Sequence, residues 1–168
     1  STDAVNFFVE KHSTFVSVRK AVLPNGKRKR IARIPVPREF ASSPFYEARA
    51  ITLSDDEMPM VEVTGQCGNK NCEKLIFRYN DATKRYLEFF RGAYSSVFVF
   101  DGYLIESGAS GCCAFEYHAY RIPASAKPIS GPPNIVISIS NKSTDSTERP
   151  VECSFADVDG EALKPPGM

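Results

Sequence analysis

The sequence predicts an all-β fold, mainly antiparallel, of the β-sandwich or jelly-roll-like barrel type, with at most one or two short helices. Three observations predict it. Short runs rich in β-branched and aromatic residues recur along the chain, turn residues separate them at close intervals, and no series of long helices alternates with them. A doubly wound α/β fold is therefore disfavoured.

Length and composition indicate an ordinary globular chain. The 168 residues are of the order of one domain, so we expect a single domain over 1–168 with a loose tail at 164–168. Hydrophobic residues make up 42% of the chain and charged residues 24%, and no apolar run approaches the ~20 residues that cross a bilayer. We therefore expect a soluble chain. The net charge of +1 gives no global attraction to nucleic acid or membranes, so only local charge could carry such binding.

The clearest predicted hairpin lies near the amino terminus. The run Thr14–Leu23 is rich in β-branched residues and leads into Asn25-Gly26, a pair that supplies the positive φ angles of a tight turn. The return strand is expected over Arg28–Val36, where prolines near its end favour an edge position or the end of pairing.

The middle of the chain predicts further strands and one helix. Strands are expected over Phe45–Leu53, Met60–Thr64 and Lys74–Tyr79. After them, Asp81 could cap a helix that carries Tyr86, Phe89 and Phe90 at helical spacing, although the aromatic content also suits a strand. We expect a short helix there.

A strand meander is expected in the second half of the chain. Its strands should cover Tyr94–Phe100, Tyr103–Ser107 and Cys112–Ile122, joined by turns at Asp101-Gly102 and Ser107–Gly111. Two more strands are expected at Ile135–Ser140 and Val151–Val158.

The cysteines permit three interpretations. Five are present, at positions 67, 72, 112, 113 and 153, so at least one cannot pair within a monomer. Up to two disulfides would fit a secreted protein, which we slightly favour, whereas reduced, partly buried thiols would fit a cytosolic one. Alternatively, two pairs with four-residue spacers could hold one zinc ion, with the ligands Cys67, Cys72, Cys113 and His118.

The predicted amino-terminal hairpin is strongly basic. Eight Lys and Arg residues fall within twenty positions, Arg19 to Arg38, with no acidic residue among them. Such a ribbon could bind phosphates, acidic sugars or an acidic protein surface, but its charges could equally protect a solvated edge strand. Lys27–Arg30 could also be a processing site or a nuclear signal. The residues singled out for binding are Arg19, Lys20, Lys27, Arg28, Lys29, Arg30 and Arg33.

An enzymatic function has few candidate residues. Only two histidines occur, and neither a nucleophile elbow nor a glycine-rich phosphate loop is present. The candidate acid–base groups for a hydrolytic reaction are Glu47, Glu88 and His118.

Two short stretches, Ser42-Ser43-Pro44-Phe45-Tyr46-Glu47 and Ser107-Gly108-Ala109-Ser110-Gly111, resemble the fungal guanyl-specific ribonucleases and occur in the same order. The resemblance covers about a dozen residues. It implies that Glu47 would be the catalytic base, but Glu106 stands where that family has its catalytic histidine and Ser95 where it has an arginine. At best it therefore implies an inactive relative.

The leading hypothesis is a non-enzymatic recognition module that presents the basic hairpin to an acidic protein, glycan or nucleic acid, as a secreted, effector-like protein could. The alternatives are a ribonuclease-like or other hydrolytic enzyme, and a structural or assembly protein such as a viral coat component, which would form oligomers.

Overall fold

The computed structural model of this chain describes residues 6–22, 27–51, 58–110, 114–125, 127–141 and 151–157. These residues form twelve strands and one short helix, and the strands pair in antiparallel fashion. The predicted all-β, mainly antiparallel fold is confirmed. The chain divides into two compact units: unit 1 holds residues 1–68, 72–92 and 125–128, and unit 2 holds the rest. The single domain over 1–168 stays a prediction, and residues 164–168 lie outside the described part.

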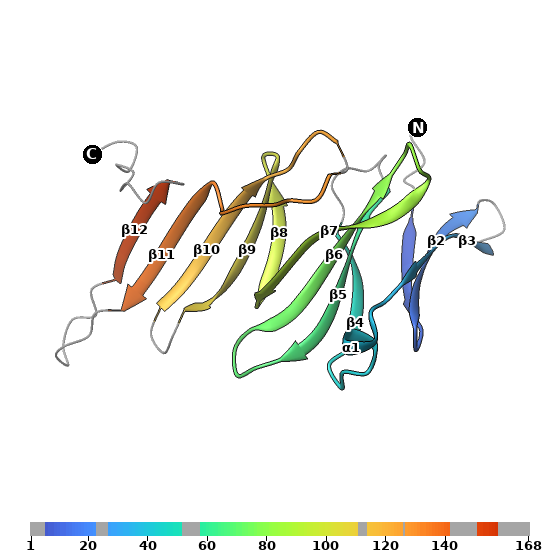
Figure 1. Cartoon of the computed structure of the whole chain (residues 1–168), viewed down its shortest axis with the longest axis horizontal. Coiled ribbons are helices and arrows are strands. Elements are labelled where there is room, and N and C mark those ends of the chain that lie inside the picture. The colour runs from blue at the N-terminus through green and yellow to red at the C-terminus, as the bar shows by residue number, and fades with distance from the viewer. Residues whose placement is uncertain are drawn as a thin grey trace. The chain divides into compact units, whose positions relative to one another are not determined.

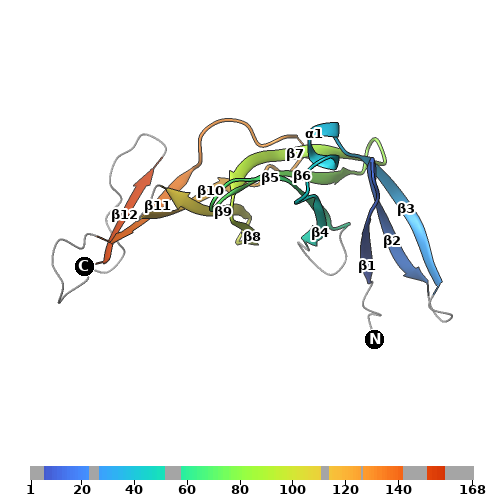
Figure 2. The ribbon, with the colours of Figure 1, turned by 90° about the horizontal axis from the view of Figure 1, so that it is seen from below.

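Unit 1 begins with a three-stranded sheet of β1 (Phe7–Lys11), β2 (Phe15–Val22) and β3 (Lys27–Pro35), in the order β1-β2-β3 (Figure 1). The predicted hairpin of β2 and β3 is confirmed, and Figure 2 shows these two strands side by side; its Asn25-Gly26 turn lies outside the described residues. The strand β1 was not predicted, because its five residues are too few to establish a period on their own. Backbone pairing with β2 from Phe7↔Lys20 to Lys11↔Val16 holds it in place.

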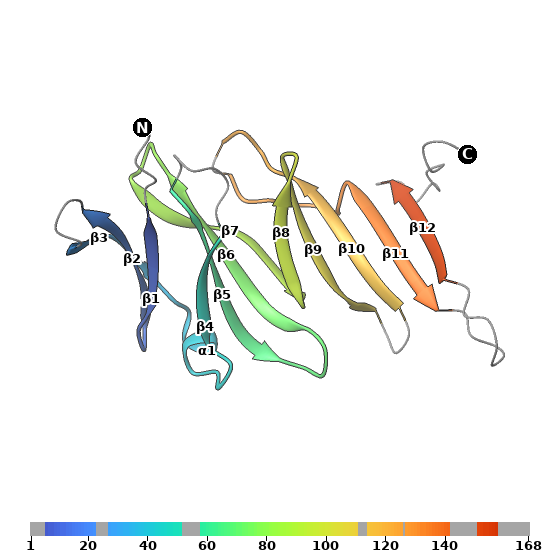
Figure 3. The ribbon, with the colours of Figure 1, turned by 180° about the vertical axis from the view of Figure 1, so that it is seen from behind.

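The second sheet of unit 1 contains β4 (Glu47–Ile51), β5 (Met60–Cys67), β6 (Cys72–Asn80) and β7 (Arg85–Tyr94), in sequence order. A short helix, α1 (Arg38–Ala41), precedes it and packs against β5 (Figure 3). The Ser43 hydroxyl, just beyond the helix, donates to the Gly65 carbonyl at 2.8 Å.

The helix expected after Asp81 is wrong, because this segment makes a turn and then β7. The Asn80 side chain accepts a hydrogen bond from the Thr83 amide, and Lys84 has a positive φ of 53°, so the chain reverses here. The aromatic residues then lie on a strand, and the Tyr86 hydroxyl donates to the Pro59 carbonyl at 2.9 Å. Tertiary pairing has overridden the local helical spacing.

The two sheets of unit 1 share one hydrophobic core, as the sheets of a sandwich do. Val16 and Val18 from β2 and Val61 and Val63 from β5 belong to this core, and all four are fully buried. The other buried members of this core are Ile34, Val36, Phe40, Tyr46, Leu75 and Phe77.

An ion network crosses the four-stranded sheet. Glu62 is buried on β5 and receives Arg49 of β4 at 2.7 and 3.1 Å and Lys74 of β6 at 3.1 Å. A buried carboxylate is costly unless it is paired and hydrogen-bonded. The two cations therefore allow Glu62 to occupy a buried position on β5.

Unit 2 contains a five-stranded sheet in the order β12-β11-β10-β9-β8 (Figure 1). Its strands are β8 (Ser96–Phe100), β9 (Tyr103–Ser110), β10 (Ala114–Arg121), β11 (Ile135–Asn141) and β12 (Val151–Asp157). The predicted meander is confirmed. Asp101 and Gly102 have φ angles of 47° and 77°, which are the positive values that a two-residue hairpin turn needs.

The turn expected at Ser107–Gly111 is wrong over its described part, because β9 continues to Ser110. Gly108, within this segment, allows the Asn71 side chain to come close to the backbone of β9. A Cβ atom on Gly108 would lie 2.9 Å from Oδ1 of Asn71, whose side chain exchanges two hydrogen bonds with the backbone of Ala109, each 3.1 Å. Gly111 lies outside the described residues.

A disulfide joins Cys67 at the end of β5 to Cys72 at the start of β6, and the two residues are paired across the hairpin. Among the described residues, no helix is long and apolar enough to cross a membrane.

Replacing Gly65 with Ala should lower the free energy of unfolding by about 1–3 kcal/mol, the usual cost of overpacking a core. The new Cβ would lie 2.6 Å from Cδ1 of Phe40, which is fully buried. Urea unfolding would measure the loss. In a Phe40→Leu background, the smaller side chain should leave room for the new Cβ, so the loss of unfolding free energy caused by Gly65→Ala should fall to less than half. An equal loss in both backgrounds would contradict this packing.

Cys67 and Cys72 should resist a thiol label in denatured, unreduced protein and accept it after reduction, because their sulfurs are bonded to each other. Peptide mapping by mass spectrometry would locate the label. Modification of either residue before reduction would show that the bond is not formed.

Candidate functional site

The basic residues of β2 and β3 divide between two faces of their sheet. Residues directly opposite on neighbouring strands point to the same face, and successive residues alternate. Val16 pairs with Ile34 and Val18 with Ala32, which defines the core-facing side. The other side carries what we call the arginine face, which comprises Phe8, Glu10, Phe15, Arg19, Arg28, Arg30 and Arg33.

A β-bulge keeps the arginines together. The register changes between Val18↔Ala32 and Arg19↔Arg30, so Arg30 and Ile31 both lie opposite one residue of β2. Without the extra residue, Arg30 would alternate onto the side opposite Arg33. With it, Arg28, Arg30 and Arg33 all point away from the core.

Two arginines of this face lie over aromatic rings. Cζ of Arg28 is 3.8 Å from the centroid of Phe8, and Cζ of Arg33 is 3.9 Å from that of Phe15. The ring of His12 stacks on Phe15 with centroids 4.2 Å apart and planes 16° apart. A guanidinium held on a ring loses little further freedom when its N–H groups bind a ligand.

The arginine face keeps an excess of positive charge. Glu10 is the only acidic residue in β1, β2 and β3, so four arginines and one glutamate leave three positive charges. Oxygens of Glu10 lie 2.7 Å from Nε of Arg19 and 3.9 Å from Nη1 of Arg28. Arg28, Arg30 and Arg33 are exposed, so the charge is presented to solvent.

The lysines of the hairpin lie on the other side. Lys20 pairs with Lys29, and Val22 pairs with Lys27, which places these lysines on the core-facing side of the sheet but beyond the core itself. All three are exposed. The seven basic residues predicted for binding are therefore two groups, of four arginines and three lysines.

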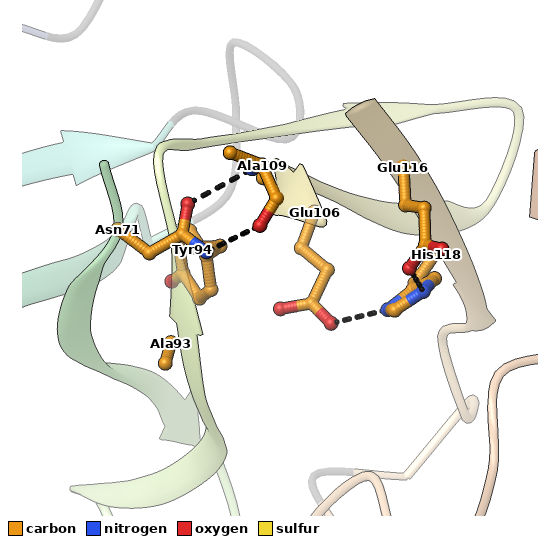
Figure 4. A pocket seen from close by; sticks show the side chains of 8 residues that line it. Asn71, Ala93, Tyr94, Glu106, Ala109, Glu116 and His118 are labelled. Atoms are coloured by element: carbon orange, nitrogen blue, oxygen red, sulfur yellow. Dashed lines mark hydrogen bonds and ion pairs between the residues drawn. The ribbon is translucent and has the colours of Figure 1, made fainter. Parts of the chain in front are cut away.

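A second polar cluster lies in unit 2, where a pocket of about 80 Å³ is lined by Asn71, Tyr94, Glu106, Glu116 and His118, with small residues between them. Nδ1 of His118 lies 3.0 Å from Glu106, and Nε2 lies 3.3 Å from Glu116 (Figure 4). Glu106 also accepts a hydrogen bond from the Tyr120 hydroxyl at 2.9 Å. Burial and the neighbouring Glu106 carboxylate raise the pKa of Tyr120.

This arrangement favours a positioned rather than a catalytic histidine. A general base needs a free ring nitrogen within reach of the proton that it abstracts, and here both nitrogens of His118 face carboxylates. Glu106 and Glu116 were not predicted as partners of His118. Glu106 lies directly opposite His118 on β9, which only the strand register reveals. Glu116 precedes His118 by two residues on β10, so the two side chains share a face of the strand.

The other two candidate acid–base residues lie in unit 1. Glu47 is exposed and pairs with Lys11 at 3.6 Å, and Glu88 is bound by Arg91 at 3.1 and 3.3 Å. In the ribonuclease-like pattern, Ser95 and Glu106 belong to unit 2. The Ser95 hydroxyl donates toward Oδ1 of Asn71 at 3.0 Å.

The cysteines of the zinc hypothesis have another partner. Cys67 and Cys72 bind each other, and a sulfur in a disulfide is not the thiolate that zinc needs. Cys113 lies outside the described residues, and His118 has the carboxylate partners given above. Within the described part of the chain, no group of three or more His, Cys, Asp or Glu residues could hold a metal ion.

Comparisons with protein-family models, with curated proteins and with solved structures found no match to this chain.

Proposed function

We propose that this chain is a recognition module that binds an acidic partner through the arginine face of β1, β2 and β3. The observation that carries the proposal is the bulge at Ile31, which collects Arg28, Arg30 and Arg33 on one exposed side of the sheet. A solvated edge strand needs charge, but it does not need its arginines sorted onto one face.

The chemistry of the arginine side chain supports this proposal. A guanidinium presents a planar fork of N–H donors that matches carboxylate, sulfate and phosphate oxygens, whereas a lysine ammonium is a point charge. The rings of Phe8 and Phe15 hold two of these forks in place. The partner would therefore be a chain of repeated anionic groups that meets several forks at once.

The disulfide favours an oxidising compartment, because such bonds persist in secreted proteins and are rare in the cytosol. A secreted recognition protein is the form of the proposal that fits this bond. The hydrolytic alternative has less support, since both ring nitrogens of His118 are occupied.

Replacing Arg28, Arg30 and Arg33 with Ser should weaken binding to heparin, used as a model polyanion, by tenfold or more. Each lost contact should also make the dependence of log K on log salt less steep by about 0.7–0.9, so the slope should change by roughly 2–3. Fluorescence anisotropy across a salt series would measure both quantities.

The matched control replaces Lys20, Lys27 and Lys29 with Ser, which removes the same charge from the same hairpin but from its other side. The affinity of this variant for heparin should stay within about threefold of the original. Salt screens the long-range attraction between the removed lysine charges and a ligand on the opposite face. An equal loss of heparin affinity in the two triple variants would show that only the net charge of the hairpin matters, and would contradict the proposal. Unchanged binding in the arginine variant would contradict it as well.

A further inference from the structure

The two ring-supported arginines differ from ordinary surface cations in what they offer a ligand. Arg28 lies on Phe8 and Arg33 on Phe15, each with Cζ less than 4 Å from the ring centroid. A guanidinium that lies on a ring on one side keeps its second flat side and its edge for a partner. Its edge donates to oxygen atoms, and its flat side can stack on another planar group.

Anionic polymers differ in whether they carry such planar groups. Heparin and acidic peptides offer sulfate or carboxylate groups, for which charge and the guanidinium edge suffice. Single-stranded nucleic acid offers phosphates and also unstacked bases, which stack on aromatic side chains and on arginine planes. In a duplex the same base faces are covered by neighbouring base pairs.

We propose that the arginine face binds single-stranded nucleic acid, with phosphates on the guanidinium edges and bases stacked on the Arg28–Phe8 and Arg33–Phe15 pairs. This inference rests on the proposed function, because it names the partner of the same surface. Arg30 lies between the two pairs along β3 and is exposed, so it serves as a phosphate contact. Glu10, held by Arg19 at 2.7 Å, leaves the net charge of the face positive.

Stacking on ring-supported arginines also predicts tolerance of base sequence. Every base has a flat face, so stacking discriminates little among bases. We therefore expect similar affinities for single-stranded oligonucleotides of different composition, and weaker binding to a duplex of the same length and sequence.

The test keeps the charge and removes the stacking platform. One variant replaces Arg28 and Arg33 with Lys, and a second replaces Phe8 and Phe15 with Leu. The probes are an oligouridylate and an oligothymidylate of about 20 nucleotides, an RNA duplex of matched length, and heparin. Both variants should bind the single strands about tenfold more weakly than the original protein, because each stacked base contributes substantially to affinity. Heparin binding and its salt slope should change by less than about threefold.

A matched control replaces Phe98 and Phe100 of β8 with Leu, since these rings are exposed but belong to unit 2. It should leave the affinity for both single strands unchanged. The Lys variant protects the test against misfolding, because it leaves Phe8 and Phe15 in place.

The outcomes separate this inference from the proposed function. If the Arg→Ser variant loses heparin and oligonucleotide binding but the Lys and Leu variants bind single strands normally, the face binds polyanions and the stacking inference is overturned. Equal losses for heparin and single strands in the Lys and Leu variants, or equal affinity for duplex and single strand, would also overturn it. If the Arg→Ser variant loses nothing, both proposals fail.

Discussion

The burial of one side of the β1–β2–β3 sheet is the constraint on which the rest of the account depends. Val16, Val18 and Ile34 are at most 1% exposed and pack into the core that the sheet shares with β4–β7. Because side chains alternate along a strand, these three fix the direction of their neighbours on β2 and, as far as the bulge, on β3. The opposite side of the sheet is thereby committed to solvent or to a partner.

The charges on this sheet lie in an arrangement that does not favour stability. Arg19 is directly opposite Arg30, and Lys20 is directly opposite Lys29. Like charges in such positions destabilise a sheet. Glu10 and the rings of Phe8 and Phe15 offset part of this cost on the arginine face. A surface that concentrates like charge and holds it in fixed positions is the basis of the proposal that it binds an anionic ligand.

Sequence reasoning predicted the features that depend on local chemistry. Alternating apolar runs predicted the main strands. Asp101-Gly102 predicted its turn, because only certain residues accept positive φ. The predictions were wrong where residues distant in the sequence determine the local structure. Tyr86 lies on a strand because β7 joins a sheet, and Gly108 lies on a strand because β9 pairs with β10, where its missing Cβ leaves room for the Asn71 side chain. The basic residues of the hairpin were predicted, but their division into arginine and lysine sides depends on a bulge that no local pattern reveals.

The pairing of β2 with β3 is the most direct test of this account, because one register places the arginines together and the other divides them. Nuclear Overhauser effects between backbone protons of the folded protein would report the pairing. The bulged register predicts cross-strand contacts for Val18 with Ala32 and for Arg19 with Arg30. Contacts of Lys20 with Arg30 and of Ala21 with Lys29 would instead show an unbulged ladder. They would move Arg28 and Arg30 to the core-facing side and would contradict the arginine face.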